Sequence, residues 1–174
     1  KGSVYTGGGH CCALTAIVGT AADGSWTASS PSALSGEDRP LLEDIDGDGA
    51  QEIIAADLGF LYTFASHAGS YTPDIVYRYT AGRLVNISTD PVARPFLEKR
   101  LHENEGFWTQ QNRSEPNGFL SYYVAMKALT GQFPAGWSYM LPRYDHDIDP
   151  AFSLSLCALG GRIESDCTPE EQQP

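Results

Sequence analysis

The first part of the chain carries short β-branched and apolar runs separated by turn residues, which is the pattern of strands. Residues 13–20 form the first clear run, and an Ala-Asp-Gly turn separates it from an extended stretch at residues 25–28. Four further strands are predicted at residues 51–56, 60–65, 74–80 and 83–88. Their short connections predict an antiparallel β-meander. Loops rich in Ser, Gly and Pro are expected at residues 31–36 and 67–73.

The pattern changes to helical spacing after residue 88. Asp90 is a good N-cap and Pro91 suits a first helical position, so a helix is predicted from there to about Asn104. A second helix is expected from residues 114–116, with apolar side chains three and four positions apart, to Gly131. A third helix is predicted over residues 135–141.

A last segment is ambiguous between strand and helix. Residues 152–156 alternate as in a strand, but Asp149 and Pro150 are typical of a helix start, and the glycines at 160–161 of a helix stop. We interpret the segment as a helix. Strands first and helices second predict an α+β fold, in which an N-terminal antiparallel β-meander precedes a layer of three to four helices. We expect one domain over residues 1–174, with a β-rich half (1–88) and a helical half (89–174).

Charge narrows the set of partners. The formal net charge is -11 and the isoelectric point is about 4.6. This balance opposes contact with phosphates, and it argues against nucleic acid and anionic membrane surfaces as partners. Cations or basic proteins fit better, although the charge also suits a secreted monomer that only needs solubility. No stretch approaches the roughly 20 apolar residues of a membrane span.

The four cysteines favour an oxidising compartment. Three pairings are possible. We favour a short loop closed by Cys157 and Cys167, which leaves Cys11 and Cys12 as a vicinal disulfide or as two thiols. In the alternative, the N-terminal pair is joined to the C-terminal pair, which closes longer loops and stabilises more. Because the chain opens at Lys1, we expect a periplasmic or extracellular protein from which a signal peptide has been removed.

The most specific chemical pattern is the segment Asp44-Ile-Asp-Gly-Asp-Gly-Ala-Gln-Glu52. Alternating aspartates on a tight Gly-containing turn can converge on one ion, and calcium takes six to eight hard oxygen ligands. Crowded carboxylates repel one another unless a cation neutralises them. The ligands that we expect are the side chains of Asp44, Asp46, Asp48 and Glu52 and the backbone carbonyl of Ala50.

The run from Leu41 to Ile54 resembles the calcium loop of FG-GAP and VCBS-type repeats. The resemblance covers about 14 residues and implies that the loop sits in a β-hairpin, with aspartates at Asp44, Asp46 and Asp48. The ninth loop position is usually Asp in these families and is Glu52 here. An EF-hand does not fit, because its twelfth position needs Glu and this chain has Ala55. An Asp- and Gly-rich turn without metal is the simpler alternative.

Three weaker patterns have ordinary explanations beside functional ones. His10 next to Cys11 can be a nucleophile pair or a zinc site, but paired cysteines are more often disulfides. Residues 145–149, Asp-His-Asp-Ile-Asp, can bind a cation or serve acid–base chemistry, but such a run is more often a solvated loop in which Asp149 caps a helix. A set of aromatic residues is more often core than ligand platform: Phe107, Trp108, Tyr122, Tyr123, Trp137, Tyr139 and Tyr144.

These patterns favour an extracytoplasmic, non-catalytic binding module with a structural calcium ion and a protein or saccharide partner. Two alternatives stay open. The first is an acidic inhibitor or immunity-type protein that neutralises a basic secreted hydrolase, which the charge and size favour. The second is a hydrolase that uses His10 and Cys11, or the cluster of residues 145–149.

Overall fold

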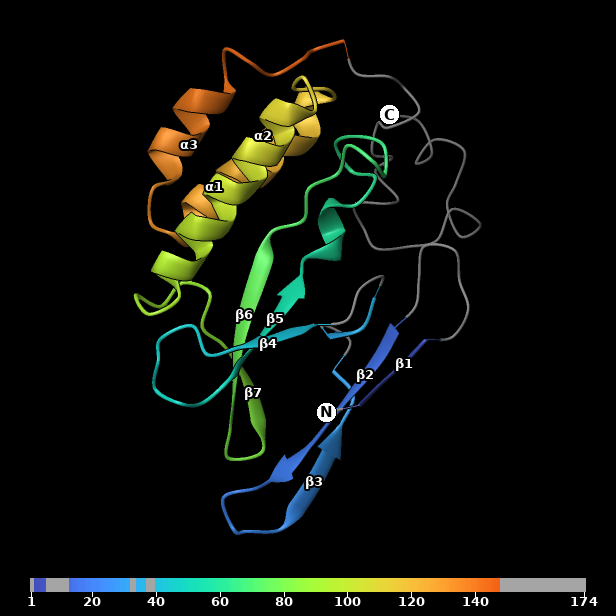
Figure 1. Cartoon of the computed structure of the whole chain (residues 1–174), viewed down its shortest axis with the longest axis vertical. Helices are drawn as coiled ribbons and strands as arrows, with labels where there is room; N and C mark the ends of the chain where they lie inside the picture. Colours follow the sequence, from blue (N-terminus) through green and yellow to red (C-terminus); the bar gives the residue numbers. More distant parts are fainter. Residues whose placement is uncertain (1, 6–12, 32–33, 37–39, 148–174) are drawn as a thin grey trace, which may run out of the picture.

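The computed structural model describes residues 2–5, 13–31, 34–36 and 40–147. In these residues two antiparallel sheets precede three α-helices along the chain, which confirms the α+β class. Figure 1 shows the helices at one end of the long axis, the first sheet at the other end, and the second sheet between them. None of the helices in the described part of the chain is long and apolar enough to cross a membrane.

The first sheet contains three strands in sequence order: β1 (Gly2–Tyr5), β2 (Ala13–Thr20) and β3 (Trp26–Ser29). The hairpin predicted over residues 13–28 is confirmed, with Ile17 opposite Ser29 and Thr20 opposite Trp26. The strand β1 is an addition to the prediction. It pairs with β2 and extends the sheet by one strand.

The second sheet has four strands in sequence order: β4 (Leu41–Glu43), β5 (Glu52–Ala56), β6 (Asp74–Thr80) and β7 (Arg83–Asn86). The predicted strands at 51–56, 74–80 and 83–88 are confirmed within two residues. The turn between β6 and β7 has positive φ at both Ala81 and Gly82, as a tight hairpin turn requires.

The strand predicted at residues 60–65 is wrong. A 3-10 helix, η2 (Leu58–Phe60), and a series of turns occupy this part of the chain. The Asp57 carboxylate accepts the Gly59 amide at 3.1 Å, and the Thr63 hydroxyl donates to the Gly59 carbonyl oxygen at 2.6 Å. These local hydrogen bonds close the backbone on itself, so the β-rich composition of the segment does not decide its structure.

The helices are α1 (Arg94–Gln110), α2 (Pro116–Leu129) and α3 (Phe133–Met140). The bounds predicted for the first helix are wrong at both ends. Asp90 instead opens a turn, in which its carbonyl accepts the Ala93 amide at 3.1 Å. At the other end α1 continues past Asn104, because the buried Trp108 packs in the core. The second and third helices agree with the predictions, and the fourth lies outside the described residues.

The second sheet is covered on both faces, which explains the continuous apolar run in β5. Ile54 and Val76 point toward the helices and share a core with Phe96, Leu97 and Phe119. Ile53 and Ala55 point the opposite way and pack with the first sheet. Strand side chains alternate between faces, so neighbouring residues of one strand serve two cores.

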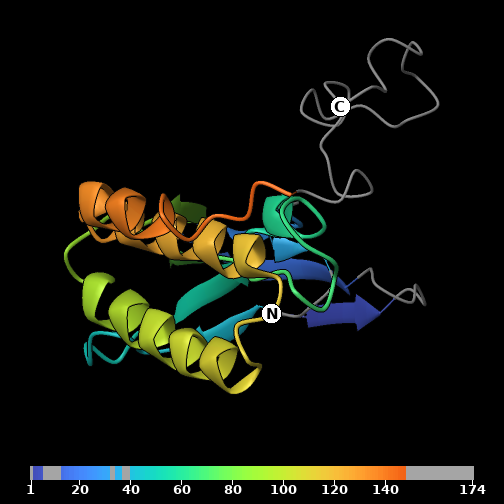
Figure 2. The same ribbon diagram turned by 90° about the horizontal axis from the view of Figure 1, so that it is seen from above.

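The helical layer packs through aromatic contacts and one close backbone approach. The rings of Trp108 and Phe119 stack with centroids 4.2 Å apart, and so join α1 to α2. Gly118 lies directly against the backbone of Gly69, in the loop that follows η2. Figure 2 shows α2 and α3 side by side when the molecule is seen from above.

Candidate metal site

The acidic segment forms the loop between β4 and β5, which pair as an antiparallel hairpin with Glu43 opposite Glu52. Gly47 and Gly49 have φ of 75° and 87°, a conformation that favours glycine. The two glycines turn the backbone sharply enough for alternate side chains to converge. The loop therefore has the hairpin setting that its resemblance to FG-GAP and VCBS-type repeats implies.

Backbone amides of the loop donate to its own carboxylates. The Asp44 carboxylate accepts the Gly47 amide at 2.7 Å and the Gly49 amide at 3.0 Å. The Asp48 amide donates to Asp46 at 3.1 Å, and the Ala50 amide donates to Asp48 at 2.7 Å. Each aspartate is thereby oriented by a hydrogen bond to a position two or more residues further along the chain.

One carboxylate oxygen from each of Asp44, Asp46 and Asp48 lies within 4.8 Å of the others, and all three residues are exposed. Calcium–oxygen distances are about 2.3 to 2.6 Å, so oxygens on one ion are separated by about 5 Å or less. The three aspartates therefore fit a calcium ion in spacing and in chemistry, and their exposure leaves room for water ligands.

Glu52 is placed differently from the other expected ligands. It is fully buried on β5, and its carboxylate accepts the Arg78 Nε–H at 2.8 Å and the Ile45 amide at 3.3 Å. Both oxygens thus have donors within the protein. The structure groups the three aspartates and sets Glu52 beneath them, where it holds the base of the loop. The carbonyl of Ala50 stays a predicted ligand.

Arg78, on the neighbouring strand β6, completes this group, and sequence reasoning missed it. Its Nη2 lies 2.7 Å from a Glu52 oxygen, 2.8 Å from an Asp46 oxygen and 4.0 Å from an Asp48 oxygen. The hydrogen bond from Arg78 lowers the pKa of Asp46 below its ordinary value. The hydrogen bonds to Glu52 and then to Asp46 raise the pKa of Arg78. The sequence holds no local signal for this role, because Arg78 comes beside Glu52 only when β5 pairs with β6.

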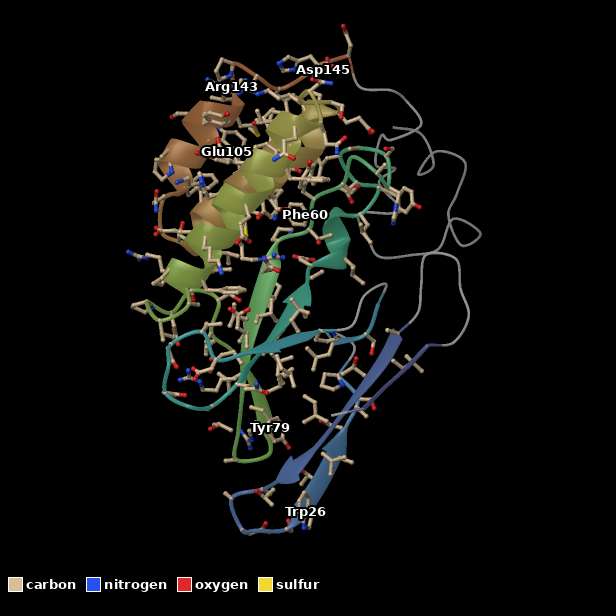
Figure 3. All side chains as sticks on the ribbon, viewed as in Figure 1. Trp26, Phe60, Tyr79, Glu105, Arg143 and Asp145 are labelled. Atoms are coloured by element: carbon tan, nitrogen blue, oxygen red, sulfur yellow. The ribbon has the colours of Figure 1, made fainter. Side chains whose placement is uncertain are left out.

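Of the other candidate residues, those that the structure describes do not join this site. His10, Cys11, Cys12, Cys157, Cys167 and Asp149 lie outside the described residues. Asp145 is in the segment after α3, at the helical end of the molecule in Figure 3, well away from the loop between β4 and β5. Its backbone exchanges two hydrogen bonds of 2.8 Å with the Asn117 side chain, and its carboxylate accepts the Asp147 amide. His146 is exposed and contacts Tyr144 edge-on. These contacts are those of a loop fastened to the start of α2.

A cavity of about 620 Å³ lies between α1, the second sheet and the loop after η2. Arg100, Asn104 and Phe107 line one wall from successive turns of α1. The nearly buried Asp74 carboxylate of β6 also lines the cavity and accepts the Arg100 Nε–H at 2.9 Å. Of the aromatic set noted in the sequence, only Phe107 lines this cavity, and Trp108 and Tyr122 are core residues.

Residues 97–174 match a family model described as the sll0997 C-terminal domain. The chain is 35% identical over 158 residues to a probable thylakoid lumen protein, sll0997, of Synechocystis sp., a match that covers 89% of the chain and 46% of that protein. It is 30% identical over 174 residues to an uncharacterized protein, y4bJ, of Sinorhizobium fredii, covering 97% of the chain and 26% of that protein. No solved structure matches the chain.

The chain spans less than half the length of each of these two relatives. The match to the family model begins within α1 and includes α2 and α3. The acidic loop lies outside the matched residues. The family-model match therefore says nothing about the loop, and any metal-binding role for it is argued from the positions of its own side chains.

Proposed function

We propose that this chain is an extracytoplasmic, non-catalytic interaction module whose acidic loop binds one structural calcium ion through Asp44, Asp46 and Asp48. The convergence of their three carboxylates within 4.8 Å at the tip of a β-hairpin is the observation that carries the proposal. The resemblance of the loop to FG-GAP and VCBS-type repeats supports calcium as the ion. Bound calcium neutralises the carboxylates and stiffens the hairpin.

The extracytoplasmic setting is inferred from one relative, and the acidic composition of the chain is compatible with it. One relative is named a probable thylakoid lumen protein, which is a compartment outside the cytoplasm. The chain itself is strongly acidic, with a net charge of -11, which suits a protein that stays soluble at high concentration. Calcium concentrations outside the cytoplasm suit a surface loop with three carboxylates and water as the remaining ligands.

The helical layer supplies a surface suited to a protein or saccharide partner. Phe133 and Trp137 of α3 are both nearly half exposed, and their rings stack with centroids 5.8 Å apart. Exposed aromatic pairs bind apolar side chains and sugar faces at little cost in conformational entropy. The acidic loop and this aromatic pair lie on different layers, so the calcium site serves the fold and the aromatic pair serves recognition.

Calorimetric titration of the metal-stripped chain with calcium tests the proposal. We expect one site in the unaltered protein and about tenfold or greater weakening in Asp48→Asn, which removes a charged ligand but keeps an oxygen for the Ala50 amide. Asp23→Asn is the matched control, because Asp23 accepts the Ser25 amide at 2.9 Å in another hairpin turn. The absence of binding heat in the unaltered protein, or equal weakening by both substitutions, rejects the proposal.

A further inference from the structure

Arg78 reaches the acidic loop from outside it. The register that places Ile53 opposite Tyr77 brings Arg78 next to Glu52, on the face of the sheet that also carries Ile54 and Val76. From there the guanidinium group extends to the loop. It donates through Nε to the buried Glu52 and through Nη2 to the exposed Asp46, at 2.8 Å in both cases. One side chain thus joins the base of the hairpin to its tip.

The crowded carboxylates of the loop favour a neighbouring cation. Three carboxylates that lie within 4.8 Å of one another repel, and Glu52 adds a buried negative charge below them. A metal ion supplies the neutralising charge when it is bound. Among the described residues, the Arg78 guanidinium is a positive group that lies near Asp46, Asp48 and Glu52 without any metal ion.

We propose that Arg78 is the resident cation of the acidic loop, and that its bridge between Glu52 and Asp46 holds the three aspartates in their converged arrangement without a metal ion. The planar fork of arginine is essential to this role, because it donates to two carboxylates at once in a fixed geometry. The inference builds on the acidic loop of the proposed function, but its test is made without metal.

The test is solvent exchange of backbone amides, measured by NMR on the full chain in a metal chelator. Arg78→Lys keeps the positive charge and can stay paired with Glu52, but it loses the second arm of the fork. We expect exchange at least about tenfold faster in this variant at the loop amides that donate to carboxylates. These are the amides of Gly47, Asp48, Gly49 and Ala50.

Two controls separate the loop from the fold. The Ser25 amide donates to the Asp23 carboxylate in the turn between β2 and β3, so its exchange should stay unchanged. Arg83→Lys makes the same substitution at an exposed position of β7 and should leave the exchange of the loop amides unchanged.

A second variant, Arg78→Gln with Glu52→Gln, replaces the charged pair with two neutral amides. It should accelerate the same loop amides.

Unchanged loop exchange in both Arg78 variants overturns the proposal. Equal acceleration at the loop and at Ser25 also overturns it, because Arg78 would then stabilise the whole fold. Addition of calcium tests the proposed function separately. If calcium fails to slow exchange in the unaltered loop while Arg78→Lys still accelerates it, the calcium function is wrong and the resident-cation role of Arg78 stands.

Discussion

Substitution of glycine by alanine should have opposite effects on the free energy of unfolding at two helical positions, Gly106 and Gly118. Gly106 in α1 is exposed, and a Cβ built on it meets no atom within 4 Å. Gly118 in α2 is buried, and its Cβ would collide with the carbonyl oxygen of Gly69 and lie 2.8 Å from the Cβ of Ala65. Helix propensity alone favours alanine over glycine by about 0.8 to 1.0 kcal/mol at both positions.

At Gly118 the packing outweighs the gain in helix propensity and makes the alanine substitution destabilising. Overpacking costs typically about 1 to 3 kcal/mol, and the obstructing atom belongs to a backbone that cannot simply rotate away. The loop around Gly69 is also fastened, because the Glu115 carboxylate accepts the Ser66 amide at 2.7 Å. The backbone obstruction puts the overpacking cost near the upper end of that range, about 3 kcal/mol, and the propensity gain offsets about 1 kcal/mol of it. We therefore expect Gly118→Ala to lower the free energy of unfolding by about 2 kcal/mol. Gly106→Ala should raise it by about 1 kcal/mol.

Urea denaturation of the two variants and the unaltered chain measures this difference of about 3 kcal/mol. For a chain of this size about 1 kcal/mol corresponds to roughly 2 to 4 °C in melting temperature, so thermal melts should show the two variants on opposite sides of the unaltered protein. A stabilised Gly118→Ala variant would mean that α2 does not lie against the Gly69 backbone as described. A destabilised Gly106→Ala variant would contradict the exposed position of that face of α1.

Two further predictions concern buried polar groups at the base of the helical layer. Burial raises the pKa of Tyr122 well above its ordinary value of 10.0. The protonated phenol therefore gives its full contribution to stability below about pH 10. Above that pH, the free energy of unfolding should fall by up to about 1.4 kcal/mol per pH unit. Tyr122→Phe, which loses the 2.8 Å bond from Asn104, should cost about 1 kcal/mol at neutral pH but flatten that alkaline slope; an unchanged slope in urea titrations refutes this. Arg100→Leu leaves the nearly buried Asp74 without its charged partner and should cost about 2 kcal/mol, of which a second substitution, Asp74→Asn, should restore more than half. If urea denaturation shows the double variant to be no more stable than Arg100→Leu, the cost does not come from the unpaired carboxylate.

The parts of the fold that the sequence predicts are those decided by near neighbours in the chain. The hairpin of β6 and β7 follows from the Ala81–Gly82 turn between two β-branched runs, and α2 follows from its apolar spacing and from the Gly131 stop. The segment at residues 60–65 has the composition of a strand, but the Asp57 and Thr63 side chains hydrogen-bond the backbone locally. Strand propensity depends on available partners, and here the backbone has closer ones.

The candidate site also combines residues that are placed by local spacing with residues that are placed by contacts between distant parts of the chain. The spacing of Asp44, Asp46 and Asp48 on a glycine turn is local, and the structure brings their carboxylates together. The position of Glu52 depends on the face of β5 to which it points, and that face is set by packing against the helices. Arg78 is an ordinary strand residue until β6 pairs with β5. No spacing rule within one segment places it among the loop carboxylates, because its role arises from contact across 26 or more positions of sequence.

The contact between Arg78 and Glu52 has a consequence for how the second sheet assembles. A slip of one residue between β5 and β6 would turn Arg78 to the opposite face, among the apolar side chains that pack on the first sheet. Glu52 would then be buried without its partner. The charged pair therefore favours the observed register of β5 and β6, because a one-residue slip leaves a buried charge unpaired, and that costs more than separating an apolar pair.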